Sequence, residues 1–228
     1  MRWLAASVHV LTAFGAVAAL FATLAIFDHQ AERMFLWLGI ALIIDGIDGI
    51  FARAIGVSER LPQFSGEVLD LVVDYLNYVF VPVLALLAWH YLDGPSGLAI
   101  AALILLSSLY HFADTQSKTK DNAFAGFPAI WNIVAFYVFA LTLSPGVTAA
   151  VCIAAIVLTF VPVPWVHPFR VELLRPLSVM AAGAFAVSSI VTVTRGLPAT
   201  PLHQAVMLVV AIYGVGLSAY LWTRQEPR

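Results

Sequence analysis

Charged side chains are scarce in this sequence. Asp, Glu, Lys and Arg make up 11% of its 228 residues, whereas a soluble domain has about 25%. The mean hydropathy is +0.95, and no polar stretch is long enough to form a separate soluble domain. The net charge of −2 provides no basic surface for a nucleic acid, so we expect none as a partner. Too few charges remain to cover a water-soluble surface, which predicts an integral membrane protein.

Cysteine is almost absent. The single Cys152 lies in an apolar stretch, which excludes a disulfide framework and leaves the redox compartment unspecified. Several histidines are scattered along the chain without zinc-ligand spacing, namely His9, His29, His90 and His203. We therefore expect neither a disulfide-stabilised fold nor a zinc site.

Long apolar runs account for most of the chain. Because a bilayer core needs about 20 apolar residues per helix, windows of that size predict about eight transmembrane helices. They cover residues 8–27, 34–55, 67–91, 97–113, 129–145, 147–162, 176–193 and 203–222. Only a few residues separate the fifth of these helices from the sixth. We expect an all-α integral membrane protein with a single domain over residues 1–228.

The basic residues predict an orientation. With the N-terminus inside, nine of the eleven Lys and Arg residues fall on one side of the membrane, and only Arg33 and Arg195 fall on the other. Lys and Arg accumulate in cytoplasmic loops. Both termini are therefore expected in the cytoplasm.

Four aspartates lie in or against the apolar helices. Asp45 and Asp48 share one face near the cytoplasmic end of the second predicted helix, and Asp70 and Asp74 share one face near the start of the third. A carboxylate at the centre of a bilayer costs about 2.5–3.5 kcal/mol. Four together require compensation, which a bound cation would provide.

Small and basic residues accompany the carboxylates. Gly49 and Ala52 leave room for a ligand to approach the backbone, and Arg53 offers a planar donor fork suited to phosphate. Carboxylate oxygens favour Mg²⁺ or Mn²⁺, and pairs of such ions are common in phosphoryl transfer. The pattern favours an enzyme acting on a phosphorylated lipid. The alternatives are solvated helix-end carboxylates and a divalent-cation transport path.

Eight positions across thirty residues form a motif, namely Asp45, Asp48, Gly49, Ala52, Arg53, Gly66, Asp70 and Asp74. This motif resembles the signature of the CDP-alcohol phosphotransferases. Twelve residues separate Arg53 from Gly66, more than in most of that family, and this spacing resembles the bacterial phosphatidylcholine synthase branch. The segments 111–114, 118–122 and 126–132 are also similar to that branch.

The resemblance implies a role for each motif residue within a helical CDP-alcohol phosphotransferase core. Asp45, Asp48 and Asp70 would be the principal ligands of two Mn²⁺ or Mg²⁺ ions. Asp74 would join in metal binding and act as the general base. The cytidine nucleotide and its phosphates would contact the remaining motif residues and two loop lysines, namely Gly49, Ala52, Arg53, Gly66, Lys118 and Lys120. As an alternative, the two lysines serve only as topology signals.

The resemblance also implies a reaction and a location. Choline would attack CDP-diacylglycerol and yield phosphatidylcholine and CMP at the cytoplasmic face of a bacterial inner membrane, among membrane lipids and in a possible homodimer. Aromatic faces are suited to the choline ammonium group. The aromatic candidates are Tyr78, Tyr110, Phe112, Trp131 and Tyr137, with Glu67 and Asp114 as possible counter-charges.

Two alternatives remain open. The acceptor alcohol could be serine, glycerol phosphate or inositol phosphate, although a phosphorylated acceptor would require a denser basic pocket. A divalent-cation transporter would distribute its acidic residues through the depth of the membrane. Here they gather at one face.

Overall fold

The computed structural model describes residues 2–114, 124–165 and 173–224. Its elements follow one another as α1 (Arg2–Phe27), α2 (Ala31–Ile55), α3 (Val57–Arg60), α4 (Gly66–Asp74), the π-helical segment η1 (Tyr75–Phe80), α5 (Val81–Ala88), α6 (Gly94–Ala113), β1 (Phe124–Ala125), α7 (Trp131–Ala140), α8 (Pro145–Thr159), β2 (Pro164–Trp165), α9 (Arg175–Arg195) and α10 (Pro201–Thr223). The strands β1 and β2 pair in antiparallel fashion. The fold is all-α apart from this short pair.

Within these described ranges, six helical segments are long and apolar enough to cross a membrane. One of them runs without interruption from Gly66 to Ala88 through α4, η1 and α5. The helices α7 and α8 have only 10 and 15 residues, so eight full-length transmembrane helices are not confirmed. The predicted fifth helix is shortened because Ala129 and Thr142 adopt left-handed φ angles of 55° and 49°, which interrupt an α-helix on either side of α7.

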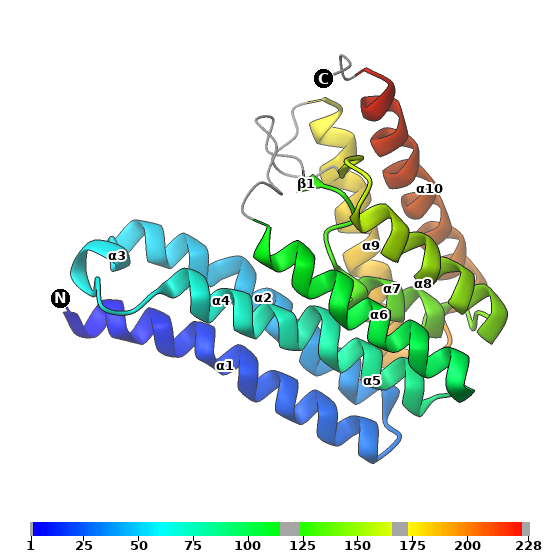
Figure 1. Cartoon of the computed structure of the whole chain (residues 1–228), viewed down its shortest axis with the longest axis horizontal. Helices are drawn as coiled ribbons and strands as arrows, with labels where there is room; N and C mark the ends of the chain where they lie inside the picture. Colours follow the sequence, from blue (N-terminus) through cyan, green and yellow to red (C-terminus); the bar gives the residue numbers. More distant parts are fainter. Residues whose placement is uncertain (1, 115–123, 166–172, 225–228) are drawn as a thin grey trace.

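The first two helices pack antiparallel along their length (Figure 1). His29, with a φ angle of 52°, reverses the chain between them. Three alanines on the buried side of α1 permit close approach, namely Ala18, Ala22 and Ala25. The rings of Phe21 and Trp37 stack at 4.7 Å between the two helices. This packing fixes α2 as a stable base for its two aspartates.

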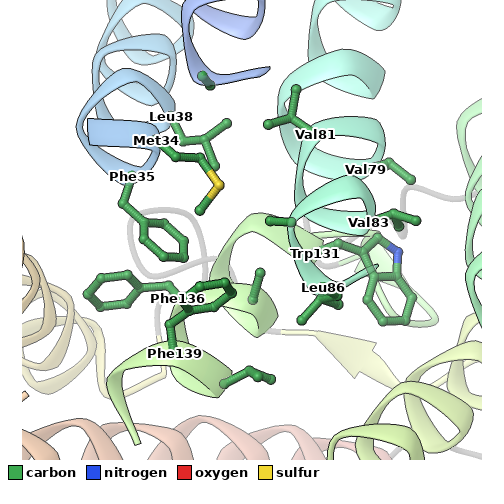
Figure 2. Close-up of a cluster of buried hydrophobic side chains, with 14 of the residues drawn as sticks. Met34, Phe35, Leu38, Val79, Val81, Val83, Leu86, Trp131, Phe136 and Phe139 are labelled. Atoms are coloured by element: carbon green, nitrogen blue, oxygen red, sulfur yellow. The ribbon is translucent and has the colours of Figure 1, made fainter. Parts of the chain in front are cut away.

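The main hydrophobic core joins α2, α5 and α7 (Figure 2). Phe35 of α2 meets Phe136 and Phe139 of α7 edge to face, with ring centroids 5.1 and 5.2 Å apart. Leu38 on α2 and Leu86 on α5 are buried in the same cluster. Because the core extends from the second helix to the seventh, these segments form one packed unit.

One end of the bundle is closed by hydrogen bonds from the turn between α9 and α10. The amide of Leu197 donates to Oε1 of Glu32 at 3.0 Å, at the start of α2. The amide of Ala199 and the side-chain amide of Gln204 donate to the carbonyl of Ala140 at 3.0 and 3.2 Å. The C-terminal end of α7 therefore lies beside the first turn of α2 and the α9–α10 turn.

The start of α7 is held by α6 and by the last turn of α8. The indole N–H of Trp131 donates to Oγ of Ser108 at 2.8 Å. The amide of Phe127 donates to the carbonyl of Leu158 at 3.0 Å. Since Trp131 and Ala140 are the two ends of α7, both ends of this short helix are held by other parts of the bundle.

Candidate metal centre

A small cavity lies between α1, α2, α4 and η1. The four aspartates expected from the sequence to converge all line it, namely Asp45, Asp48, Asp70 and Asp74. Thr12, Asn77 and Tyr78 supply the other polar side chains. The structure therefore brings both aspartate pairs into one cavity.

Local structure sets the register of the two pairs. Gly56, with a φ angle of 68°, ends α2 and donates its amide to the carbonyls of Ala52 and Arg53. Ser65 then caps the next long helix, and its hydroxyl accepts from the amide of Val68 at 3.2 Å. Because α4 starts at Gly66, Asp70 and Asp74 fall on successive turns of the same face.

The carboxylate geometry suits a cation. Asp45, Asp70 and Asp74 each offer one carboxylate oxygen, and these oxygens lie within 4.8 Å of one another. Asp48 is 5% exposed, and its Oδ2 has no hydrogen-bond partner among the described residues. A buried carboxylate oxygen without a partner is costly. The set fits a hard, oxygen-preferring divalent cation.

Asn77 adds a neutral acceptor that the sequence analysis did not identify. Its Nδ2 donates to the carbonyls of Gly15 at 3.0 Å and Val73 at 2.9 Å, which fixes the orientation of the amide. Its Oδ1 is buried and has no partner in the described part of the chain. In the sequence, Asn77 is marked as a candidate site residue by its position three residues beyond Asp74 in an apolar helix.

Tyr78 is held by one of the carboxylates. Its hydroxyl donates to Oδ2 of Asp45 at 2.5 Å, within the range of a hydrogen bond to a charged acceptor. It lies in η1, and π-helical turns are frequent at functional sites. Among the choline candidates named from the sequence, Tyr78 is the one that lines this cavity.

The residues expected at the nucleotide divide into two groups. Arg53 is exposed, and its Nη1 would lie 3.3 Å from a Cβ placed on Gly49. These two residues therefore adjoin on α2. A Cβ on Gly66 would lie 3.2 Å from Cε1 of His9 in α1, and Ala52 packs beside the small cluster of α1 and α3. Ala52 and Gly66 thus face α1.

The remaining candidates do not line the cavity. Trp131 is fully buried in the main core, and Tyr110 is exposed, with its ring 5.2 Å from that of Phe160. Glu67 is exposed in the first turn of α4. The other three have contacts elsewhere or lie outside the lining set, namely Phe112, Tyr137 and Asp114. Lys118 and Lys120 lie outside the described residues.

Apolar helices with converging carboxylates on two of them, and an arginine five residues beyond Asp48, are typical of a membrane-bound phosphotransferase. The chain belongs to the CDP-alcohol phosphatidyltransferase family, whose model matches residues 5–161. The resemblance drawn from the motif is confirmed. The chain is an enzyme of this family.

Three relatives from different bacteria carry the same name. The chain is 39% identical over 220 residues to the phosphatidylcholine synthase of Pseudomonas aeruginosa. This alignment covers 96% of the chain and 92% of the relative. The chain is 44% identical over 214 residues to the phosphatidylcholine synthase of Bradyrhizobium diazoefficiens, covering 93% and 80%. It is 32% identical to the phosphatidylcholine synthase of Borreliella burgdorferi, covering 100% and 97%. These alignments extend well beyond the aspartate motif.

Proposed function

We propose that the chain is a phosphatidylcholine synthase, which transfers the phosphatidyl group of CDP-diacylglycerol to choline and releases CMP. The convergence of four aspartates on one cavity supports the chemistry. The relatives named phosphatidylcholine synthase support choline as the acceptor. Serine, glycerol phosphate and inositol phosphate are the alternative acceptors.

The reaction forms one bond at phosphorus and breaks another. The hydroxyl oxygen of choline bonds to the phosphorus that carries diacylglycerol, and the bond from that phosphorus to CMP breaks. Asp74 accepts the hydroxyl proton as the attack develops. When bound, divalent cations offset the negative charge of the diphosphate and of the departing CMP.

Each remaining carboxylate has a holding role in this proposal. Asp45, Asp48 and Asp70, with Asp74, would ligate two Mn²⁺ or Mg²⁺ ions. Three of these residues already present oxygens within 4.8 Å of one another. Because α2 and α4, which carry the aspartates, both pack against α1, little movement is required to order the site. This supplies the positioning contribution to the rate.

Donor and acceptor would occupy different sides of the carboxylates. Arg53 is assigned to the diphosphate, because it is exposed and adjoins Gly49, which has no side chain to obstruct a phosphate. Choline is assigned to the ring of Tyr78, the aromatic candidate that lines the cavity. Ala52 and Gly66 would shape the nucleotide site through their packing against α1.

We propose eight membrane crossings, with α7 and α8 as the short ones. The bonds of Trp131 to Ser108 and of Ala140 to Ala199 support this topology, because they hold both ends of α7 inside the helix bundle. A hydrophobic helix shorter than the bilayer is accommodated by local thinning of the bilayer or by association with other helices. The basic residues would then place the carboxylates and both termini at the cytoplasmic face of an inner membrane.

We also propose a single domain over residues 1–228. The main hydrophobic core includes Ala199 and Met207 from the C-terminal helix pair, which supports this assignment. A homodimer remains a prediction.

A transfer assay on purified protein in detergent tests the proposed function. Labelled choline, CDP-diacylglycerol and Mn²⁺ or Mg²⁺ should yield labelled lipid and CMP in equal amounts. Asp74→Asn should abolish turnover while CDP-lipid binding remains measurable. Asp28→Asn, which changes an exposed carboxylate at the other end of α1, should have no effect.

Other outcomes would redirect the proposal. CMP release with another alcohol, but none with choline, would overturn choline as the acceptor. Near-normal turnover by Asp74→Asn would overturn the assignment of the general base. Metal uptake into vesicles without any transfer would favour a cation transporter.

A further inference from the structure

An apolar groove lies between α2, α7 and α9, separate from the carboxylate cavity. Its walls include Phe35, Leu38 and Leu42 from α2, Phe136 from α7, and Phe185 and Ile190 from α9. Its volume is about 330 Å³, and one side opens to the outside. Phe35 and Phe136 approach one another within it (Figure 2). The described structure therefore contains a recess of ligand size within its membrane-spanning part.

The groove lies along the side of α2 that carries Gly49 and Arg53, whereas Asp48 points into the carboxylate cavity. Phe35, Leu38, Leu42, Asp45 and Gly49 follow one another at spacings of three, four, three and four residues. Residues at such spacings lie along one side of a helix. Leu42 is therefore about one turn from Asp45, and the stripe from Leu42 to Phe35 extends about 10 Å further from the carboxylates.

This direction matches the shape of a lipid. A diphosphate held near Asp45 and Arg53 at one end of α2 leaves the diacylglycerol to extend along the helix into the bilayer. The stripe from Leu42 to Phe35 lies in that direction. A second protein chain or a bulk lipid could also cover an apolar surface. Continuity with the side of α2 that carries Gly49 and Arg53 favours the substrate's own chain.

The second wall comes from outside the family core. The family model ends at residue 161, whereas α9 begins at Arg175. The far end of α9 is held to the core, because the amide of Leu197 donates to Glu32 at 3.0 Å. The C-terminal helix pair thus closes a groove that the matched part of the chain would leave open on one side.

We propose that this groove binds one acyl chain of the CDP-lipid donor, with α9 as its outer wall. The proposal rests on the proposed function. Gly39 lies in the groove, and a Cβ placed there would have no atom within 4 Å. A larger side chain at this position would occupy the space of the acyl chain, and its Cβ would not clash with the protein.

Gly39→Phe tests the groove with donors of two chain lengths. It should raise the KM for CDP-dioleoylglycerol about tenfold, since losing the burial of about two methylene groups is sufficient. The KM for CDP-dihexanoylglycerol and the KM for choline should remain unchanged. Gly216→Phe, at an exposed and open position on α10, is the matched control. Equal loss with both donors, or no loss with either, would overturn the proposal.

Ala186→Phe provides a second variant, from the α9 wall. It should give the same dependence on chain length, and thermal unfolding in detergent should show that both variants are folded. If Ala186→Phe has no effect while Gly39→Phe does, the role of α9 is overturned.

Photo-crosslinking identifies the occupant directly. A CDP-lipid with a diazirine on one acyl chain should label residues 185–194 of α9. Excess unlabelled CDP-diacylglycerol should prevent this labelling, and excess phosphatidylglycerol should not. Equal competition by both would make the groove a bulk-lipid site and overturn the proposal. Because this readout needs no turnover, it stays informative even if wild-type protein fails to transfer to choline, which would overturn only the proposed acceptor.

Discussion

Tyr78 and Asp45 are joined across the contact between η1 and α2 by a hydrogen bond from the tyrosine hydroxyl to Oδ2 of the carboxylate. One oxygen of Asp45 is therefore oriented by the neighbouring helix, and the other remains available to a cation. Hydrogen bonds to ligating carboxylates commonly set the affinity of a metal site. Tyr78 thus has a positioning role in addition to any contact of its ring with choline.

Tyr78→Phe separates these two roles. Removing the hydroxyl should raise the Mn²⁺ concentration at half-maximal activity about tenfold, because Asp45 loses its partner. The KM for choline should remain unchanged, because the ring is retained. Kinetics at varied Mn²⁺ and choline concentrations measure both effects. A higher KM for choline with unaltered Mn²⁺ dependence would contradict the positioning role.

The burial of the Asp48 carboxylate predicts how the stability of the protein changes when metal is removed. Its Oδ2 is buried without a partner in the described structure, among three other carboxylates. In EDTA, Asp48→Asn should raise the melting temperature, because it removes one of several like charges. With Mn²⁺ at about 100 times its Kd, wild-type protein should gain about 2.7 kcal/mol, and the variant should gain much less.

Thermal unfolding in detergent, with and without Mn²⁺, measures these shifts. Asp28→Asn is the control, because its carboxylate is exposed and far from the cavity. An equal gain from Mn²⁺ in wild type and Asp48→Asn would show that Asp48 is no ligand.

Sequence reasoning located the carboxylates because their spacing alone places each pair on one helix face. Gly49 and Arg53 could be predicted from spacing in the same way. The orientation of the Asn77 side chain could not be predicted, because it depends on the carbonyl of Gly15 in another helix. The hydroxyl contact of Tyr78 likewise depends on how η1 and α2 are placed against α1. Helix spacing describes faces, whereas these contacts arise from tertiary packing.

Helix lengths show the same limit. The apolar run around α7 predicted a full-length transmembrane helix, but left-handed backbone at Ala129 and Thr142 limits it to 10 residues. Neither residue type signals that conformation. The groove also could not be predicted from the sequence, because its walls on α2 and α9 are about 150 residues apart and share no sequence pattern.

Gly15 controls the distance between α1 and α4. A Cβ at this position would overlap Cγ1 of Val73, and the carbonyl of Gly15 accepts from Asn77. Gly15→Ala should therefore destabilise the protein by about 1–3 kcal/mol. It should also weaken Mn²⁺ binding, because Asn77 is displaced. Thermal unfolding and Mn²⁺ titration measure the two effects.

Two further variants serve as controls for the steric effect at Gly15. Val73→Ala in the Gly15→Ala background should restore most of the stability, because it removes the overlapping methyl group. Gly214→Ala, where no atom lies within 4 Å of the new Cβ, should stabilise α10 by about 0.5–1 kcal/mol. A loss at Gly214 as large as that at Gly15 would contradict the steric explanation.

Glu32 fastens the C-terminal helix pair to the family core. Its Oε1 accepts from the amide of Leu197 at 3.0 Å. Glu32→Leu leaves this amide without a partner and should cost about 1–3 kcal/mol, measured by thermal unfolding. It should also raise the KM for long-chain CDP-diacylglycerol, because α9 forms one wall of the groove. Glu32→Gln retains an acceptor oxygen and should lose far less stability. If the Gln variant is as unstable as the Leu variant, the negative charge of Glu32, rather than its hydrogen bond, holds the helix pair in place.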